Sequence, residues 1–163
     1  MSTKVIAIGS ILMGDDSIGI KVLEKIQSSL NSYGIETFIG ETDTEYCISL
    51  LEDKDFIFIL DAAMLGNKTG DITIIPLEQY KNYFKGCSQH SNNLLDMLYI
   101  YGKNIKGYFI GIEALDIVCS LKISRSLQMC LDKISSDVLN IILELSCRKV
   151  IGNELEDSSF TKK

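Results

Sequence analysis

The apolar positions of this chain switch repeatedly between strand-like runs and helical spacing. Val5 to Ile8 is an uninterrupted apolar run, as in a strand that is buried on both faces. From Ile18 the apolar residues instead recur three or four positions apart, as on one side of a helix. A turn bounded by Gly9 and Gly14 separates the two patterns. This stretch therefore predicts a strand, a turn and a helix in succession.

Four later segments are rich in β-branched and aromatic residues and are predicted to be strands: 35–39, 55–60, 71–75 and 108–112. The second of these is expected to end at Asp61. Only a short turn separates it from the next strand, and a parallel crossover needs about a dozen residues or more. We therefore predict that the 71–75 strand runs antiparallel to its predecessor.

Helical spacing returns between and after these strands. A helix capped by Thr42 is expected to reach Leu51, and another is expected to open at Ser91. The longest helix is expected to begin at Ser124 and to end before Gly152. This alternation predicts an α/β fold: a three-layer sandwich in which a mostly parallel, twisted sheet of about five strands carries helices on both faces.

Composition narrows the class of protein and of partner. A chain of 163 residues predicts one domain, which we place at 1–152, followed by a polar, flexible tail at 153–163. The net charge of −6 argues against nucleic acid or an anionic membrane as the main partner. The N-terminus lacks the pattern of a signal peptide, and the five cysteines are scattered. We expect a cytoplasmic monomer with reduced thiols.

The first candidate for chemistry is an acidic pair, Asp15 and Asp16, directly after Gly14. The glycine spacing imitates a phosphate-binding P-loop, but such a loop continues with Lys and then Ser or Thr. Two carboxylates would repel a phosphate and attract a cation. The alternative interpretation is that the pair only caps the following helix, since acidic residues are favoured at a helix N-terminus.

The topology predicts that the acidic pair meets two more polar residues. Carboxyl ends of parallel strands lie at one edge of a sheet, and ligands bind in the crevice there. Asp15 and Asp16 follow the first strand, Asp61 ends the third, and His90, the single histidine, lies on the long loop beside it. Two carboxylates and an imidazole suit a first-row divalent ion in an open, hydrolytic site. A lone histidine is, however, also common as a surface or packing residue.

Three motifs carry a resemblance to a known family. They are I-G-S-I-L-M-G-D-D-S-I-G near the N-terminus, F-I-L-D-A at 58–62 and C-S-Q-H-S at 87–91. With them, and with matching length and element order from Lys4 to about Arg148, the chain resembles the hydrogenase maturation proteases. These endopeptidases trim the large subunit of nickel–iron hydrogenases.

The resemblance implies a substrate and a set of site residues. It implies that Asp16, Asp61 and His90 meet a nickel ion that arrives already bound by cysteines of the hydrogenase precursor. Nickel then licenses removal of a C-terminal extension, and no organic cofactor is needed. We expect four further residues of the first motif to help to position the substrate: Gly9, Ser10, Gly14 and Asp15.

The chain departs from the family pattern at three positions of the first motif. Ala7 and Ser17 stand where the family usually has glycine, and Ser10 stands where it usually has asparagine. We expect Ala7 to be tolerated inside a strand. The change to Ser10 replaces an amide with a hydroxyl and bears on the range of substrates.

Three other functions are compatible with parts of the pattern. A phosphoacceptor receiver domain also combines an acidic pair with an aspartate after the third strand, but it requires a lysine where this chain has Ile112 and Glu113. A cysteine hydrolase could use Cys87 with His90, since an imidazole can activate a nearby thiol. A relative that binds the nickel-loaded precursor without cutting it is the third alternative.

Overall fold

The computed structural model describes residues 2–79, 89–101 and 105–158. Its five strands form one sheet in the order β2-β1-β3-β5-β4. They are β1 (Thr3–Ile8), β2 (Glu36–Glu41), β3 (Phe56–Ala63), β4 (Ile72–Pro76) and β5 (Lys106–Glu113). The helices are α1 (Ile18–Ser32), α2 (Thr44–Ser49), α3 (Gln89–Ile100) and α4 (Arg125–Ser158), with a short 3-10 turn η1 (Gly14–Ser17) before α1.

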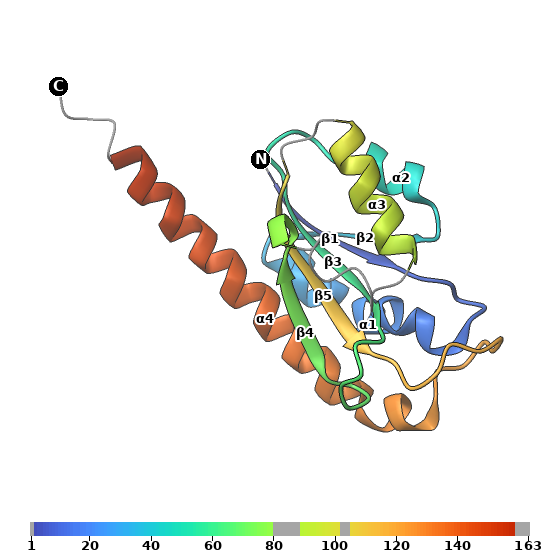
Figure 1. Cartoon of the computed structure of the whole chain (residues 1–163). Helices are drawn as coiled ribbons and strands as arrows, with labels where there is room; N and C mark the ends of the chain where they lie inside the picture. The colour runs from blue at the N-terminus through green and yellow to red at the C-terminus, as the bar shows by residue number, and fades with distance from the viewer. Residues whose placement is uncertain (1, 80–88, 102–104, 159–163) are drawn as a thin grey trace.

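The predicted three-layer α/β architecture is confirmed. Strands β2, β1, β3 and β5 are parallel, and only the edge strand β4 is antiparallel. Helices α1 and α4 cover one face of the sheet, and α2 and α3 cover the other (Figure 1). Alternate residues of β3 face the two layers: Phe58 and Leu60 join the α1/α4 core, and Ile57 and Ile59 join the α2/α3 core.

The sheet corrects two expectations about the third and fourth strands. β3 does not end at Asp61 but continues to Ala63, because it pairs with β5 as far as the Ala63–Glu113 pair. The antiparallel direction of β4 is confirmed, but its partner is β5 rather than β3. A receiver domain has a wholly parallel sheet. The antiparallel edge strand β4 therefore excludes that alternative.

Helix boundaries differ from expectation in three places. Asp43, not Thr42, caps α2, and its carboxylate accepts a hydrogen bond from the Tyr46 amide at 2.9 Å. α3 begins before Ser91 and therefore includes His90 in its first turn. α4 passes through Gly152 without ending, which is tolerable because one glycine costs a helix only about 1 kcal/mol relative to alanine. In Figure 1 the C-terminal part of α4 extends away from the sheet.

A buried ion pair fastens the start of β1 to the start of β3. The Lys4 Nζ lies 2.6 Å from Asp55 Oδ2 and also donates to the Leu50 carbonyl at 2.7 Å. Amides of Ser2 and Glu52 donate to the same carboxylate. Burial by itself would raise the pKa of Asp55, but Lys4 and the two amides outweigh it and hold the pKa well below its usual range.

Removing this carboxylate should destabilise the fold strongly. Asp55→Ala leaves the Lys4 ammonium buried without its partner, so we expect a loss of about 3–5 kcal/mol in the free energy of unfolding at pH 7. Asp132→Ala is the matched control, because Asp132 pairs with Lys25 at the surface and should contribute less than about 1 kcal/mol. Urea denaturation measures both.

The pH dependence gives a second check on the ion pair. A carboxyl group with a lowered folded-state pKa stabilises the fold above its unfolded pKa, about 3.9, and this stabilisation is lost as the pH falls towards the folded pKa. The stability difference between wild type and Asp55→Ala should therefore be constant from about pH 5 to pH 8 and shrink below about pH 4. A difference that persists undiminished at low pH would contradict the ion-pair explanation.

Candidate active site

The candidate residues gather where the parallel strands end. β1 and β3 are neighbours in the sheet, so the turn after β1 and the last residues of β3 lie at one edge, here named the carboxyl edge. Turn η1 contacts β3 directly. Gly19, just after this turn, leaves no room for a side chain, because a Cβ would lie 2.8 Å from the Leu60 carbonyl oxygen and 3.0 Å from the Asp61 amide nitrogen. The start of α1 is thus seated on β3 beside Asp61.

The two glycines of the first motif shape the turn that carries Asp16. Gly9 has φ +128°, and a Cβ there would overlap the Asp16 carbonyl oxygen at 2.0 Å. Gly14 has φ +56°, a conformation that residues with side chains rarely adopt. Both glycines therefore serve the backbone path, and this geometry brings the Ser10 amide back to the Asp16 side chain.

Asp16 is held by its own turn. Its Oδ2 accepts a hydrogen bond from the Ser10 amide at 2.6 Å, and the residue is 4% exposed. The Ser10 hydroxyl accepts from the Leu12 amide at 3.3 Å. Neither η1 nor α1 has a side-chain cap. The start of α1 is therefore not capped by a side-chain hydrogen bond of the acidic pair, and the carboxylate of Asp16 is directed by the Ser10 amide.

Asp15, the neighbouring acid, has a different environment. Its carboxylate accepts hydrogen bonds from the amides of Leu115, Asp116 and Ser124, at 3.0, 3.4 and 2.5 Å. These hydrogen bonds of Asp15, which is 1% exposed, tie the loop after β5 to turn η1. The sequence predicted that Asp15 helps to position the substrate, and this role stays a prediction. Its hydrogen bonds go to amides of the loop after β5.

Asp61 is fully buried within β3, and its Oδ1 accepts a hydrogen bond from the Ala62 amide at 2.8 Å. The alternation along β3 places Asp61 on the same face as Ile57 and Ile59, the face that α2 and α3 cover. This assignment depends on β3 staying regular through Asp61, where the sequence expected the strand to end.

His90 is the second residue of α3, and its side chain lies outside the described part of the structure. The helix leads, over a short connection, into β5, which runs parallel to β3. α3 therefore runs antiparallel to these strands, and its 12 residues, about 18 Å long, bring its first turn to the carboxyl edge. Figure 1 shows this end of α3 at that edge. The fold thus puts the His90 backbone on the same face and at the same edge as Asp61.

A residue that the sequence did not single out completes the edge. Glu113, the last residue of β5, is 3% exposed, and its carboxylate accepts hydrogen bonds from the amides of Leu65, Gly66 and Asn67. In the sequence, only the place of Glu113 at the end of a predicted strand could have indicated that it belongs to this edge. The loop that follows β3 and Asp61 is therefore fixed by a buried carboxylate of the neighbouring strand.

The departures from the family pattern are accommodated. Ala7 is fully buried in the core under α1 and α4, which confirms that its methyl group fits within the strand. The Ser17 hydroxyl donates to the Gly14 carbonyl at 2.7 Å and so has a partner inside the turn. The Ser10 backbone makes the contact to Asp16, whatever side chain that position carries.

Asp16 and Asp61 provide oxygen donors of the kind that bind divalent cations. Within the ranges that the structure describes, no three His, Cys, Asp or Glu side chains converge on one point. The third predicted ligand, His90, and the rival nucleophile, Cys87, lie outside that description, and the set of three stays a prediction. Of the cysteines that are described, Cys47 is unsuited to nucleophilic chemistry, because burial and the nearby Asp43 raise the pKa of its thiol to about 11.

Comparison with known proteins supports one family. No family model matches the chain. A curated protein of Methanocaldococcus jannaschii, provisionally named a hydrogenase maturation protease, is 26% identical over 156 residues, which cover 89% of this chain and 90% of the relative.

Solved structures share the fold. The hydrogenase maturating endopeptidase HybD from Escherichia coli has a TM-score of 0.72 at 20% identity, over 88% of this chain and 93% of its own. The nickel–iron hydrogenase maturation protease HybD from Thermococcus kodakarensis has a TM-score of 0.71 at 22% identity, over 87% of this chain and 99% of its own. The resemblance indicated by the three motifs is therefore confirmed: in sequence and in fold this chain is similar to the hydrogenase maturation proteases.

Proposed function

We propose that this chain is an endopeptidase that removes the C-terminal extension of a nickel–iron hydrogenase large-subunit precursor after nickel has been inserted. The observation that carries the proposal is the placement of two buried aspartates, Asp16 and Asp61, with the first turn of α3 at one edge of the sheet. Nickel is part of the substrate in this proposal. Asp16, Asp61 and His90 contact it.

The chemistry of the two carboxylates fits this role. Burying negative charge is costly, and a divalent cation at the carboxyl edge offsets that cost. The cation can polarise the scissile carbonyl or lower the pKa of a bound water if it keeps an open coordination position. One of the two aspartates then serves as the base. No thiol of the protease takes part.

The test is direct. The chain is incubated with nickel-loaded large-subunit precursor, and the intact mass of the precursor is followed. We expect a single mass loss that corresponds to a C-terminal fragment. An unchanged mass, with the precursor still bound to the chain, would instead support the non-catalytic relative.

Two substitutions separate this mechanism from a cysteine hydrolase. We expect His90→Ala to slow processing by about 10²–10⁴-fold, the usual contribution of a residue that acts on the reacting groups. Cys87→Ser should process within about twofold of wild type, as should wild type after its thiols are alkylated. The initial rate of precursor cleavage measures all three. A fast His90→Ala and an inactive Cys87→Ser would reverse the assignment.

A further inference from the structure

Large apolar side chains are concentrated on the loops of the carboxyl edge. Among the described residues, six of the twelve that are exposed lie there, with exposed fractions from 41% for Ile11 to 74% for Leu121. We name this set the apolar rim: Ile11, Leu12, Met64, Leu115, Val118 and Leu121. Exposed apolar side chains that gather in one place commonly mark an interaction surface.

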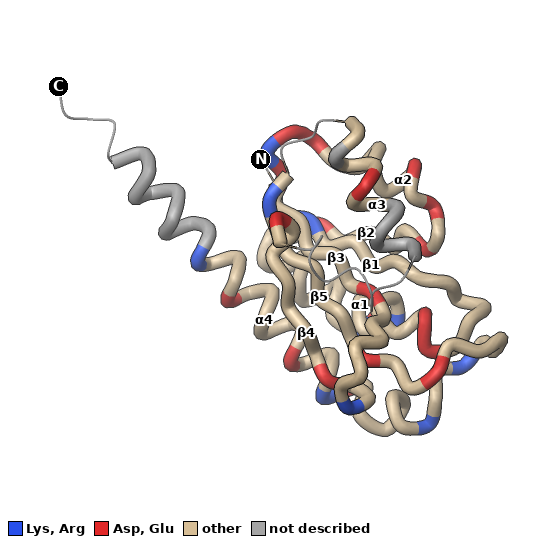
Figure 2. Tube along the Cα trace, viewed as in Figure 1, with Lys and Arg blue, Asp and Glu red and all other residues tan. Residues whose placement is uncertain are grey.

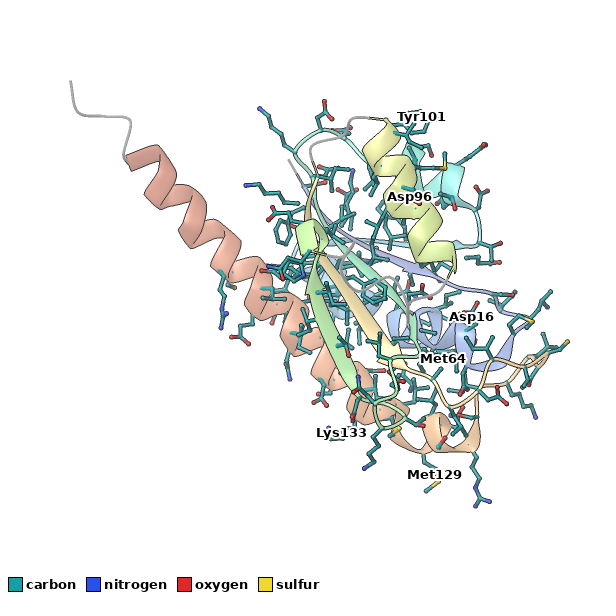
Figure 3. All side chains as sticks on the ribbon, viewed as in Figure 1. Asp16, Met64, Asp96, Tyr101, Met129 and Lys133 are labelled. Carbon is teal, nitrogen blue, oxygen red and sulfur yellow. The ribbon has the colours of Figure 1, made fainter. Side chains whose placement is uncertain are left out.

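Backbone hydrogen bonds join the loops of the rim into one surface. The Ser120 amide donates to the Leu12 carbonyl at 3.0 Å, and the Gly14 amide donates to the Ser120 carbonyl at 2.8 Å. The Ala114 amide donates to the Ala63 carbonyl at 2.8 Å, which places Met64 beside the start of the loop after β5. Figure 1 shows the loop after β1 and the loop after β5 side by side. Figure 3 shows Met64 at the same end of the sheet as Asp16.

The rim is held in shape by two buried carboxylates that the proposed reaction does not use. Asp15 binds three amides of the loop after β5, and Glu113 binds three amides of the loop after β3. Hydrogen bonds that a charged carboxylate accepts are stronger than those between two neutral groups. Apolar side chains on loops fixed in this way lose little conformational entropy when a partner covers them.

Charge also distinguishes the rim. The chain has a net charge of −6, yet residues 10–14 carry no charged side chain and residues 115–121 carry only Asp116. In Figure 2 the tips of these two loops carry neither colour, and one acidic and one basic residue lie nearer the base of the loop after β5. The occupant of the rim is therefore expected to be uncharged and apolar.

We propose that the apolar rim binds an uncharged, apolar segment of the polypeptide substrate next to the scissile bond. This inference rests on the proposed function, because a peptidase must hold its polypeptide against the catalytic groups. The rim is continuous with those groups: Ile11 directly follows Ser10, whose amide is bonded to Asp16. The segment that lies across the rim is thereby guided to the carboxyl edge.

The test compares rim variants with a control residue that is at least as exposed. Leu12→Ser and Leu121→Ser each remove apolar surface from the rim, and Met129→Ser does so on α4, outside the rim (Figure 3). With nickel-loaded precursor as the probe, each rim substitution should raise KM about tenfold and leave kcat within about twofold, as for uniform binding of substrate and transition state. Met129→Ser should change neither constant, and all three variants should unfold at the wild-type temperature.

The possible outcomes separate this inference from the proposed function. If wild type cuts the precursor and the Leu12→Ser, Leu121→Ser double variant cuts it with unchanged KM, the rim proposal is overturned and the proposed function stands. The same holds if the double variant only abolishes a dimer seen by sedimentation. If wild type does not cut, binding of the precursor is measured by biolayer interferometry. Weaker binding by the rim variants supports the rim, and equal or absent binding overturns it.

Discussion

Asp16→Asn should abolish processing of the precursor and leave the fold almost unchanged. The substitution keeps the size of the side chain and an oxygen that can accept the hydrogen bond from the Ser10 amide. It removes the charge that would meet the substrate's nickel and, if Asp16 is the base, the proton acceptor. We expect the single-turnover rate to fall by about 10²–10⁴-fold.

The measurement needs a rate and a stability for the same protein. Cleavage is followed by intact mass, and thermal unfolding by circular dichroism; we expect the midpoint to stay within a few degrees of wild type. Asp53→Asn is the control, because Asp53 is exposed in the turn that precedes β3, at the opposite edge of the sheet. An Asp16→Asn protein that processes at the normal rate would reduce Asp16 to a structural residue of its turn.

The second large effect concerns the origin of the metal. We expect the purified chain to be essentially free of nickel, and nickel-free precursor to resist cleavage even when the protease is in excess. Two carboxylates and one imidazole form a set without a thiolate, so the affinity for free nickel should be modest. The Irving–Williams order also gives such a set no preference for nickel over copper. Selectivity must then come from the precursor, whose cysteines hold the ion and complete its coordination.

Elemental analysis of the purified chain and paired cleavage assays test this prediction. The assays use one precursor preparation, with and without nickel, and a copper-loaded sample as a control for metal identity. Stoichiometric nickel held by the protease alone would contradict the prediction, as would efficient cleavage of nickel-free precursor. Catalysis that survives Asp16→Asn but requires nickel would show that the metal needs fewer ligands from the protease than we propose.

Several features of the fold follow from local sequence pattern. The run from Val5 to Ile8 and the helical spacing from Ile18 were sufficient to predict β1, its turn and α1, because burial imposes different periods on strands and helices. The short connection after β3 was sufficient to predict an antiparallel β4. The shared carboxyl edge of parallel strands was sufficient to predict that Asp16 and Asp61 lie at the same end of the sheet.

Other features depended on pairing between distant segments. β5 lies between β3 and β4, and its pairing extends β3 through Asp61, so it decides which face of the sheet that carboxylate occupies. Nothing local to residues 56–63 contains this information, since the partner strand begins more than 40 residues later.

The clearest division lies within the acidic pair. As two adjacent residues of one type, Asp15 and Asp16 are indistinguishable by pattern, and the sequence by itself determined only that negative charge follows Gly14. The tertiary structure gives the two residues different partners. The Asp16 carboxylate accepts a hydrogen bond from the Ser10 amide, whereas the Asp15 carboxylate accepts hydrogen bonds from amides that lie 100 to 109 residues further along the chain. Partners of a buried carboxylate are set by which loops the sheet brings together, and local sequence does not encode that proximity.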